Sequence, residues 1–345
     1  MSFINRSLTL SLITIIGLTT ITVHPMLRHC ATRLSTAARP ASRYVGLKKP
    51  GLVGRFANLS LRTSIATPSR SFATGGKKTK SIDHKTSDLK KFHESWSGKD
   101  YNQHSDPQLT MGLEVFNKYY LPYIQPNALI LDAGCGTGRI TTQIAKHVPQ
   151  GVVIGIDRAP DMIAAAQQQC NPDDDRLIFK RKDVCKLDYE ETFDHAISLS
   201  CLHWVSDIKK AFKSVADSLK PGGTFLILME PKNDFPLTKA LVEIFCKYNL
   251  EIPWYMYTRE DLFTWLKEAG FSMVGSHDYH YEVTFKNETG LVDWLSGIPC
   301  AAHLSKDEQT KIINEVVNRY VRYEPVKADD SLKLTLPEIV ILARK

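Results

Sequence analysis

A glycine-rich turn near residue 135 is the feature that most limits what this chain can fold into. The turn reads Asp-Ala-Gly-Cys-Gly-Thr-Gly over residues 132–138 and lies between a strand-length apolar run and a helix-forming segment. Its three glycines let the backbone pass close to a ligand, and the next helix directs free N–H groups toward a carboxylate or phosphate. A dinucleotide-binding turn would require a further glycine where this chain has Arg139. The acid two residues before the first glycine instead suits a ligand with an amino-acid end, because Asp132 can attract its ammonium group.

Apolar runs of strand length alternate with helix-length periodic segments after about residue 85. This alternation is typical of an α/β domain with a mostly parallel sheet and crossover helices. We expect strands at 129–132, 152–157, 177–181, 195–200, 224–229, 272–285 and 338–343, and helices at 140–147, 160–169, 208–219, 237–248, 259–269, 291–295 and 306–323. The pattern therefore predicts a single domain over residues 85–345, built on a seven-stranded sheet.

Two further carboxylates follow strands next to the glycine turn. Asp157 ends the second predicted strand, where it can accept hydrogen bonds from both ribose hydroxyls of an adenosine. It could instead cap the helix that begins at Pro160. Asp183 follows the third strand, where it can accept from an adenine amino group while Val184 flanks the ring. An ordinary turn at the strand end is the alternative for Asp183.

The first 80 residues have the composition of a mitochondrial targeting segment. They contain 13 Lys or Arg residues and no Asp or Glu, the first acid being Asp83. We expect translation from Met26, processing near residues 70–74, and a mature protein in the mitochondrial matrix. An apolar run at 8–23 allows a competing interpretation as a secretory signal or membrane anchor, although it is short for a membrane span. We expect no stable membrane span in the mature chain.

The charge balance after residue 80 and the cysteine content of the whole chain exclude further classes of function. Without the first 80 residues, 31 basic residues stand against 37 acidic ones, so the basic pI gives no argument for nucleic-acid binding. The seven cysteines are odd in number and include no C-x-x-C pair, which favours a reducing compartment and indicates no metal site. We expect a monomer that acts on a small molecule.

Five sequence motifs occur in order over residues 90–230. They are Asp132-x-Gly134-x-Gly136-x-Gly138, Asp157 nineteen residues past the last glycine, Asp183, the stretch Ser198–Val205, and Leu219-Lys220-Pro221-Gly222-Gly223. Together they resemble the class I S-adenosylmethionine-dependent methyltransferases. The Leu-His-Trp-Val stretch at 202–205 and the C-terminal half resemble the group that includes trans-aconitate, malonyl-carrier-protein and juvenile hormone acid methyltransferases.

This resemblance implies a Rossmann-like fold with helices on both faces of the sheet and S-adenosyl-L-methionine as the cofactor. It also implies a C-terminal helical cap, formed by residues 230–272 and 286–325, on the acceptor side. The segment 96–108, which contains Tyr101 and Gln108, resembles the lid that closes over the cofactor in that group. The cofactor-binding residues implied are Tyr101, Asp132, Gly134, Cys135, Gly136, Gly138, Asp157, Arg158, Met162, Asp183, Val184, Leu199 and Ser200.

Methyl transfer from a sulfonium depends mainly on aligning the acceptor, the methyl group and the sulfur, and a carboxylate acceptor needs no general base. It needs donors that orient it, and His203 and Trp204, just past the fourth strand, are candidates for the catalytic residues. His203 could instead be a half-buried histidine at the start of a helix.

The acceptor pocket is expected to contain Trp254, Tyr255, Tyr257 and Trp294, with Glu230 and His303 as further candidates. The alternative for this aromatic set is the core of the helical cap.

Two functions from different classes remain open. The first is a methyltransferase acting on a small molecule, with O-methylation of a carboxylic acid as the reaction. The second is a mitochondrial respiratory-complex assembly or protein-modifying factor, because the Leu-His-Trp-Val stretch also resembles a complex I assembly factor that hydroxylates arginine on the same fold. Fold alone does not decide between them.

Overall fold

The computed structural model describes residues 95–345 except 172–173, 253 and 302–303. The described residues fall in one compact unit, Thr79–Lys345. The predicted targeting segment, the start at Met26 and the candidate His303 lie outside the described residues. Among the helices that the structure describes, none combines enough length and hydropathy to cross a membrane.

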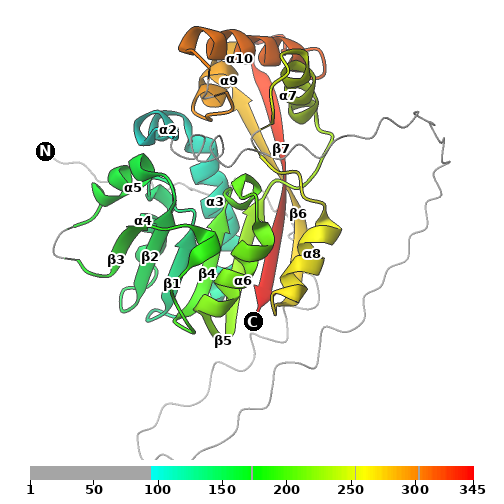
Figure 1. Cartoon of the computed structure of the whole chain (residues 1–345). Helices are drawn as coiled ribbons and strands as arrows, with labels where there is room; N and C mark the ends of the chain where they lie inside the picture. Colours follow the sequence, from blue (N-terminus) through cyan, green and yellow to red (C-terminus); the bar gives the residue numbers. More distant parts are fainter. Residues whose placement is uncertain (1–94, 172–173, 253, 302–303) are drawn as a thin grey trace, which may run out of the picture. The chain divides into compact units, whose positions relative to one another are not determined.

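The described residues form a seven-stranded sheet of the order β3-β2-β1-β4-β5-β7-β6 (Figure 1). Its strands are β1 Leu129–Ala133, β2 Val152–Asp157, β3 Leu177–Arg181, β4 Phe193–Leu199, β5 Leu219–Met229, β6 Ser272–Phe285 and β7 Leu332–Arg344. Strands β1 to β5 pair in parallel, whereas β7 is antiparallel to both β5 and β6. The predicted, mostly parallel Rossmann-like sheet is confirmed. The chain order reverses between β1 and β4, so a crevice for ligands is expected at the carboxyl ends of these strands.

Helices cover both faces of this sheet, and three further helices, α7, α9 and α10, pack in a separate hydrophobic cluster. The helices are α2 Gly98–His104, α3 Asp106–Tyr119, α4 Arg139–Ala145, α5 Pro160–Gln167, α6 Ile208–Ser218, α7 Pro236–Lys247, α8 Arg259–Glu268, α9 Glu288–Ser296 and α10 Lys306–Tyr320, with short 3-10 turns η3 Leu121–Tyr123, η4 Val184–Lys186 and η5 Leu202–Trp204. Helix α3, which the sequence pattern did not predict, presents Met111, Val115 and Phe116 to the sheet at the spacing of one helix face.

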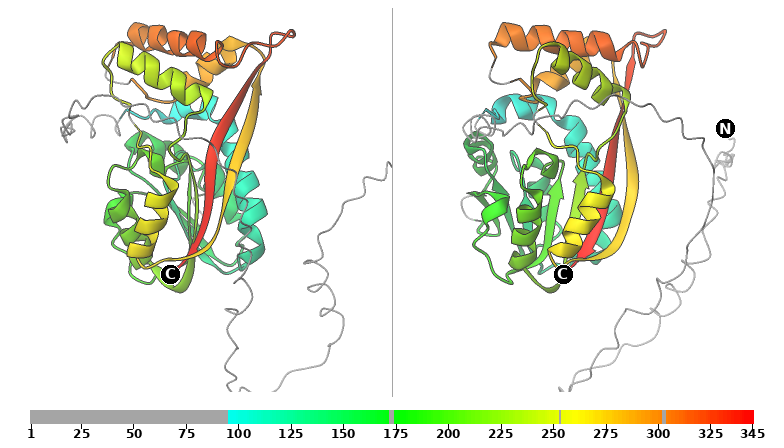
Figure 2. Two further views of the ribbon diagram at one scale, coloured as in Figure 1. Left: turned by 90° about the vertical axis from the view of Figure 1, so that its right-hand side faces the viewer. Right: turned by 45° about the vertical axis from the view of Figure 1, so that its right-hand side comes forward.

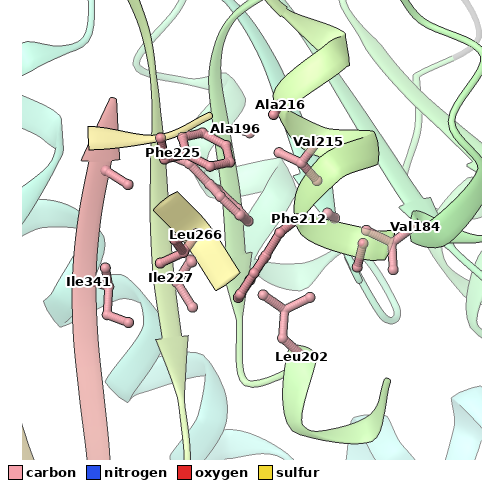
Figure 3. Close-up of a cluster of buried hydrophobic side chains, with 14 of the residues drawn as sticks. Val184, Ala196, Leu202, Phe212, Val215, Ala216, Phe225, Ile227, Leu266 and Ile341 are labelled. Atoms are coloured by element: carbon pink, nitrogen blue, oxygen red, sulfur yellow. The ribbon is translucent and has the colours of Figure 1, made fainter. Parts of the chain in front are cut away.

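Alternate residues of β1 point to opposite faces of the sheet and belong to two different hydrophobic cores. Leu131 packs with α6 and α8, whereas Ile130 packs with α3 and α4. Figure 3 shows the first of these cores, in which Phe212 of α6 lies among strand residues such as Phe225. Because Phe212 is fully buried, truncating it to alanine is expected to cost about 3–5 kcal/mol. These two cores hold the strand ends, and with them the turns above, in fixed positions.

Helices α7, α9 and α10 form a separate cap with a core of its own. Strands β6 and β7 extend beyond the other strands to reach it (Figure 2). Leu332, Leu334 and Leu336 of β7 pack against these helices. Helix α8 differs from the prediction for residues 230–272, because its Leu262 and Leu266 pack in the sheet core rather than in the cap.

Strand β7 begins six residues before the predicted start at residue 338. Pro337 lies within it, and a proline in a sheet is usually confined to positions where no backbone N–H is needed for pairing with a neighbouring strand. Here β5 pairs with β7 only from Ile339 onward, so Pro337 lies outside the stretch that is paired on both sides. The early part of β7 carries the strand from the cap into the sheet.

Candidate active site

The glycine turn bends in a way that requires glycine at two positions in particular. Gly134 and Gly138 both have positive φ values, 88° and 78°. A Cβ atom at Gly134 would lie 2.1 Å from Cys201 Sγ, and one at Gly138 would lie 2.5 Å from the ring of Phe179. The turn is fixed to β2 because the N–H groups of residues 134 and 135 both donate to the carbonyl of Ile156. Its backbone can therefore approach a ligand from a defined position.

Asp157 connects the end of β2 to this turn. Its Oδ2 accepts from the Gly136 N–H at 3.0 Å, and its Oδ1 accepts from the Ala159 N–H at 2.9 Å. Burial raises the pKa of the Asp157 carboxyl, while the backbone hydrogen bonds oppose the rise. The alternative that Asp157 caps the helix beginning at Pro160 is not realised, because the N-cap of α5 is Ala159 and receives no side-chain cap hydrogen bond. Asp157 instead holds the loop before α5 through the Ala159 N–H and lines a cavity over the glycine turn.

A cavity of about 470 Å³ opens over the turn, within the range typical of small-molecule sites. The predicted cofactor-binding residues that line it are Tyr101, Gly134, Cys135, Gly136, Asp157, Arg158, Met162, Asp183, Val184, Leu199 and Ser200. Asp183 also accepts from the Cys185 N–H at 3.0 Å, so it caps η4 as a strand-end turn would. Residues that were not predicted as cofactor-binding also line it, among them Trp96, Thr137, Ile140, Lys182 and Lys210.

Two predicted cofactor residues do not line this cavity. Asp132 is buried beneath the turn, and its Oδ2 accepts from Thr141 Oγ1 at 2.6 Å. Burial raises the pKa of Asp132 to about 7. The prediction that Asp132 contacts an ammonium group of the ligand is therefore corrected, because the Asp132 side chain is bonded to Thr141 of α4 and does not line the cavity. Gly138 is the N-terminal cap of α4 and packs against Phe179. It therefore sets the conformation of the turn without lining the cavity.

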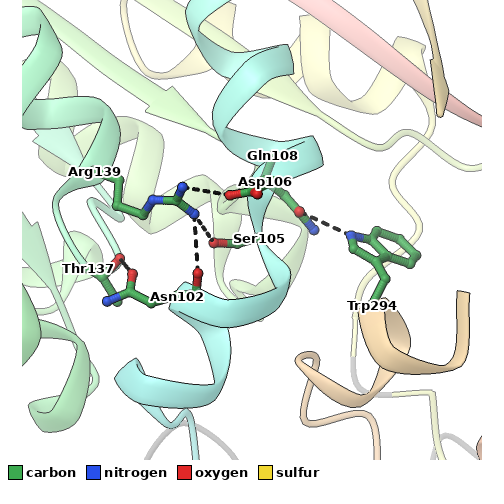
Figure 4. A network of polar contacts seen from close by, with 7 residues as sticks. All are labelled: Asn102, Ser105, Asp106, Gln108, Thr137, Arg139 and Trp294. Carbon is green, nitrogen blue, oxygen red and sulfur yellow. Dashed lines mark hydrogen bonds and ion pairs between the residues drawn. The ribbon is translucent and has the colours of Figure 1, made fainter. Parts of the chain in front are cut away.

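The segment predicted as a lid lies over the turn and is held by a polar network (Figure 4). Thr137 Oγ1 donates to Asn102 Oδ1 at 2.6 Å, and Arg139 donates to Ser105 Oγ at 3.1 Å and to Asp106 Oδ1 at 2.6 Å. The Asp106 side chain is 76% exposed, so its ion pair with Arg139 contributes little by itself. The network mainly sets the position of α2, which brings Tyr101 over Gly136.

A second cavity, of about 90 Å³, adjoins the first on the side of the cap. The two share four lining residues, Trp96, Tyr101, Ser200 and Trp204. The smaller cavity is also lined by the predicted residues His203, Trp254, Trp294 and Glu230. A methyl donor in the large cavity and an acceptor in the small one would therefore meet at the shared residues.

Tyr255 and Tyr257, predicted as acceptor residues, line neither cavity. Tyr257 Oη donates to the Val205 carbonyl at 2.6 Å, and the Tyr255 N–H donates to the His203 carbonyl at 2.7 Å. The two rings stack at 5.9 Å. Both residues hold the loop after β4 from outside the cavities. The prediction that Tyr255 and Tyr257 line the acceptor pocket is therefore corrected, because these two aromatic residues serve packing instead.

His203 is 7% exposed, and its Nδ1 accepts from the Glu230 N–H at 3.4 Å. Burial lowers the pKa of His203 to about 3. The ring is therefore neutral near pH 7, and with Nδ1 accepting, its Nε2 carries the proton. Such a ring can donate a hydrogen bond but is a weak base.

Several other groups beside the small cavity can donate hydrogen bonds. Ser200 Oγ and Trp254 Nε1 are buried and have no hydrogen-bond partner among the described residues. Ser200 also has a positive φ of 54°, an uncommon conformation for a non-glycine residue that is often found at functional sites. Gln108 Oε1 accepts from Trp294 Nε1 at 3.1 Å, which leaves the Gln108 amide NH₂ as a donor. Sequence reasoning noted Gln108 only as part of the lid.

The chain is similar to known methyltransferases in both sequence and fold. The family model for a methyltransferase domain matches residues 130–223. A trans-aconitate 2-methyltransferase of Deinococcus radiodurans is 25% identical over 61% of this chain and 83% of its own length. A malonyl-[acyl-carrier protein] O-methyltransferase of Bacillus anthracis is 30% identical over 36% of this chain and 46% of its own. A crystal structure from Bacillus halodurans, described as a methyltransferase, superposes with a TM-score of 0.50 at 19% identity and covers 70% of this chain and 99% of that one.

The large cavity also fits an S-adenosylmethionine molecule by its chemistry. The turn leaves no room for a Cβ at Gly134, and the buried Asp157 carboxylate lines the wall at the switch point of the sheet. Asp183 and Val184 line the same cavity where an adenine ring is expected. With the matched domain and the sheet order, these features identify the chain as a class I S-adenosylmethionine-dependent methyltransferase that resembles the group containing trans-aconitate and malonyl-carrier-protein methyltransferases.

Proposed function

We propose that this methyltransferase methylates a carboxylate oxygen of a small organic acid. The supporting observation is the set of donors around the small cavity. Ser200 Oγ and Trp254 Nε1 are buried and have no hydrogen-bond partner in the described part of the chain. The Gln108 amide presents its NH₂ group, and His203 is neutral with Nε2–H. A carboxylate is purely an acceptor and satisfies such groups, whose burial without a partner is unfavourable.

This reaction requires positioning more than proton transfer. S-adenosylmethionine supplies an activated methyl group, and a carboxylate is already nucleophilic, so a general base is not required. Holding the two reactants in line can lower the barrier by roughly 7–11 kcal/mol. Tyr101 and Trp204, which line both cavities, are placed to exclude water from the junction.

The relatives support the same reaction class. Two of them are named for methylation of trans-aconitate and of malonyl-[acyl-carrier protein], and both of these compounds carry carboxylates. Because these relatives are named as methyltransferases, the alternative of a respiratory-complex assembly or protein-modifying factor is not favoured.

The test is an assay of the full chain with methyl-labelled S-adenosylmethionine and a panel of monocarboxylic, dicarboxylic and amine acceptors. A methyl ester releases its label as methanol in dilute alkali, whereas an N-methyl or C-methyl product retains it. We expect alkali-labile label with at least one acid. Label only in alkali-stable products would contradict the proposal.

We further propose that the protein acts in the mitochondrial matrix as a monomer, without a nucleic-acid partner, after its first residues are removed. The support is compositional: residues 1–80 are basic and lack acids, while the remaining chain has more acidic than basic residues.

A further inference from the structure

Two glutamates face each other at the wall of the small cavity. Strand β5 pairs antiparallel with β7, and the last pair in register is Met229 with Ile339. Extending this register by one residue places Glu230, which directly follows β5, opposite Glu338 of β7, and the charge of Glu230 acts on the Glu338 carboxyl. Both glutamates line the cavity. Like charges directly opposite each other on a sheet are destabilising, so this pair lowers the stability of the folded protein without serving the fold.

Burial removes water from both carboxyl groups, and the Glu338 carboxyl is less well compensated by hydrogen bonds. Glu338 is 6% exposed, and its Oε2 has no hydrogen-bond partner among the described residues. Glu230 accepts from Asn233 Nδ2 at 2.7 Å and from Thr238 Oγ1 at 3.2 Å. Burial raises the pKa of both glutamates, and the charge of Glu230 raises the pKa of Glu338 further. An uncompensated carboxyl of this kind favours a ligand that brings positive charge or hydrogen-bond donors.

The described lining of the small cavity supplies no cation to the glutamate pair. None of the described residues that line the small cavity is Lys or Arg. The walls are aromatic instead and include Trp254, Trp294 and Phe235. An aromatic wall beside carboxylates suits a protonated amine, because ring faces attract cations and carboxylates pair with them. A hydroxyl has one hydrogen to donate and would leave the repulsion between the two carboxylates in place.

We propose that Glu230 and Glu338 bind a protonated amine on the methyl acceptor, so that the acceptor is an amino acid whose ammonium lies far from the carboxylate that is methylated. The part of this inference that concerns the methylated carboxylate rests on the proposed function. The amine site itself stands on the glutamate pair alone.

The sheet sets the distance between the two ends of such an acceptor. Ser200 follows β4, Glu230 follows β5, and Glu338 lies in β7, and these three strands are adjacent in that order. Neighbouring strands are about 4.8 Å apart, so the glutamates lie roughly one to two strand spacings, about 5–10 Å, from the junction at Ser200. An α-amino acid is too short to span that distance. A linear ω-amino acid with about four to six carbons between its two charged groups has the required length.

The first experiment measures binding and does not depend on turnover. Hexylammonium is titrated into the full chain with S-adenosylhomocysteine present, and the tryptophan fluorescence of the cavity walls reports the complex. We expect saturable binding that weakens roughly tenfold or more in Glu338→Gln and in Glu230→Gln, since each loses one charged partner. Glu282→Gln is the matched control, because Glu282 is 57% exposed on β6 and pairs with Lys333. Thermal unfolding of each variant verifies that it is folded.

The second experiment compares 6-aminohexanoate with heptanoate, which has the same length and a methyl group in place of the ammonium. We expect kcat/KM to favour 6-aminohexanoate by roughly tenfold or more in the wild type, and this preference to disappear in Glu338→Gln but not in Glu282→Gln. Absence of hexylammonium binding to the folded wild type, or equal use of the two acids, overturns the inference. If hexylammonium binding depends on Glu338 but no acid is methylated, the amine site is supported and the proposed carboxylate methylation is contradicted.

Discussion

Trp294 of the cap donates a hydrogen bond from Nε1 to Gln108 Oε1 at the start of α3, at 3.1 Å. The contact joins two segments separated by 186 residues in the sequence and closes the small cavity between them. It also fixes the orientation of the Gln108 amide. The acceptor site is thus assembled from the lid and the cap together.

Replacing Gln108 by Leu should impair acceptor binding while leaving the cofactor site intact. The variant removes the amide donor and leaves Trp294 Nε1 without a partner, so we expect the acceptor KM to rise roughly tenfold. Affinity for S-adenosylmethionine, measured by calorimetry, should stay within about twofold of the wild type, since Gln108 does not line the large cavity. Gln103→Leu, on the exposed side of α2, is the control. An unchanged acceptor KM in Gln108→Leu would show that the amide does not contact the acceptor.

Replacing Asp157 by Ala tests the ribose contact. Loss of a charge-assisted pair of hydrogen bonds should weaken S-adenosylmethionine binding by about 2–4 kcal/mol, or roughly 30-fold or more. The variant also leaves the N–H groups of Gly136 and Ala159 without their acceptor, so circular dichroism must accompany the calorimetry. Asp161→Ala in the first turn of α5 removes an exposed acid nearby and should bind normally. Normal affinity in a folded Asp157→Ala protein would rule out the assignment.

Replacing His203 by Gln separates an orienting role from a base. Glutamine can still donate a hydrogen bond to a carboxylate but cannot accept a proton near pH 7. Because burial lowers the pKa of His203 to about 3, we expect the variant to keep a measurable part of its kcat. A loss of roughly a thousand-fold or more with cofactor binding retained would indicate general base catalysis.

The same histidine should influence stability in acid. Its folded-state pKa of about 3 lies below the unfolded value of about 6.5, so the unfolded chain binds the proton first. Stability is therefore unaffected above about pH 6.5 and is lost as the pH falls toward 3, by at most about 1.4 kcal/mol per pH unit. Burial also lowers the pKa of His195, so only the difference between wild type and His203→Gln isolates this residue. Urea unfolding between about pH 6 and 4 should show a shallower decline in the variant; parallel curves would contradict the buried, neutral assignment.

The targeting proposal has a direct measurement. We expect mass spectrometry of the chain purified from mitochondria to find an N-terminus near residue 75, because the basic segment before it is removed on import. An N-terminus at Met1 or Met26 would contradict the proposal.

The sequence predicted the sheet and the large cavity better than the acceptor side. The bounds of β2 and β3 are reproduced without change, since an apolar run bounded by turn residues has few other ways to be buried. The position of Tyr257 could not be predicted, because an aromatic loop residue packs or lines a pocket according to tertiary contacts. Glu338 was overlooked, although an acid within the apolar run 334–343 could have been noticed as a candidate buried charge. Glu230 was predicted as a candidate for the acceptor pocket, but its pairing with Glu338 follows only from the register of β5 and β7.

The pH dependence of kcat with both substrates saturating tests the central claim most directly, because it reports whether the acceptor or a base must lose a proton. For a carboxylate oriented by neutral donors, we expect kcat to stay within about twofold from pH 8 down to about 5, since the acid itself ionises near pH 4. An amine or hydroxyl acceptor would give the opposite result. A kcat that rises about tenfold per pH unit through this range would contradict carboxylate methylation.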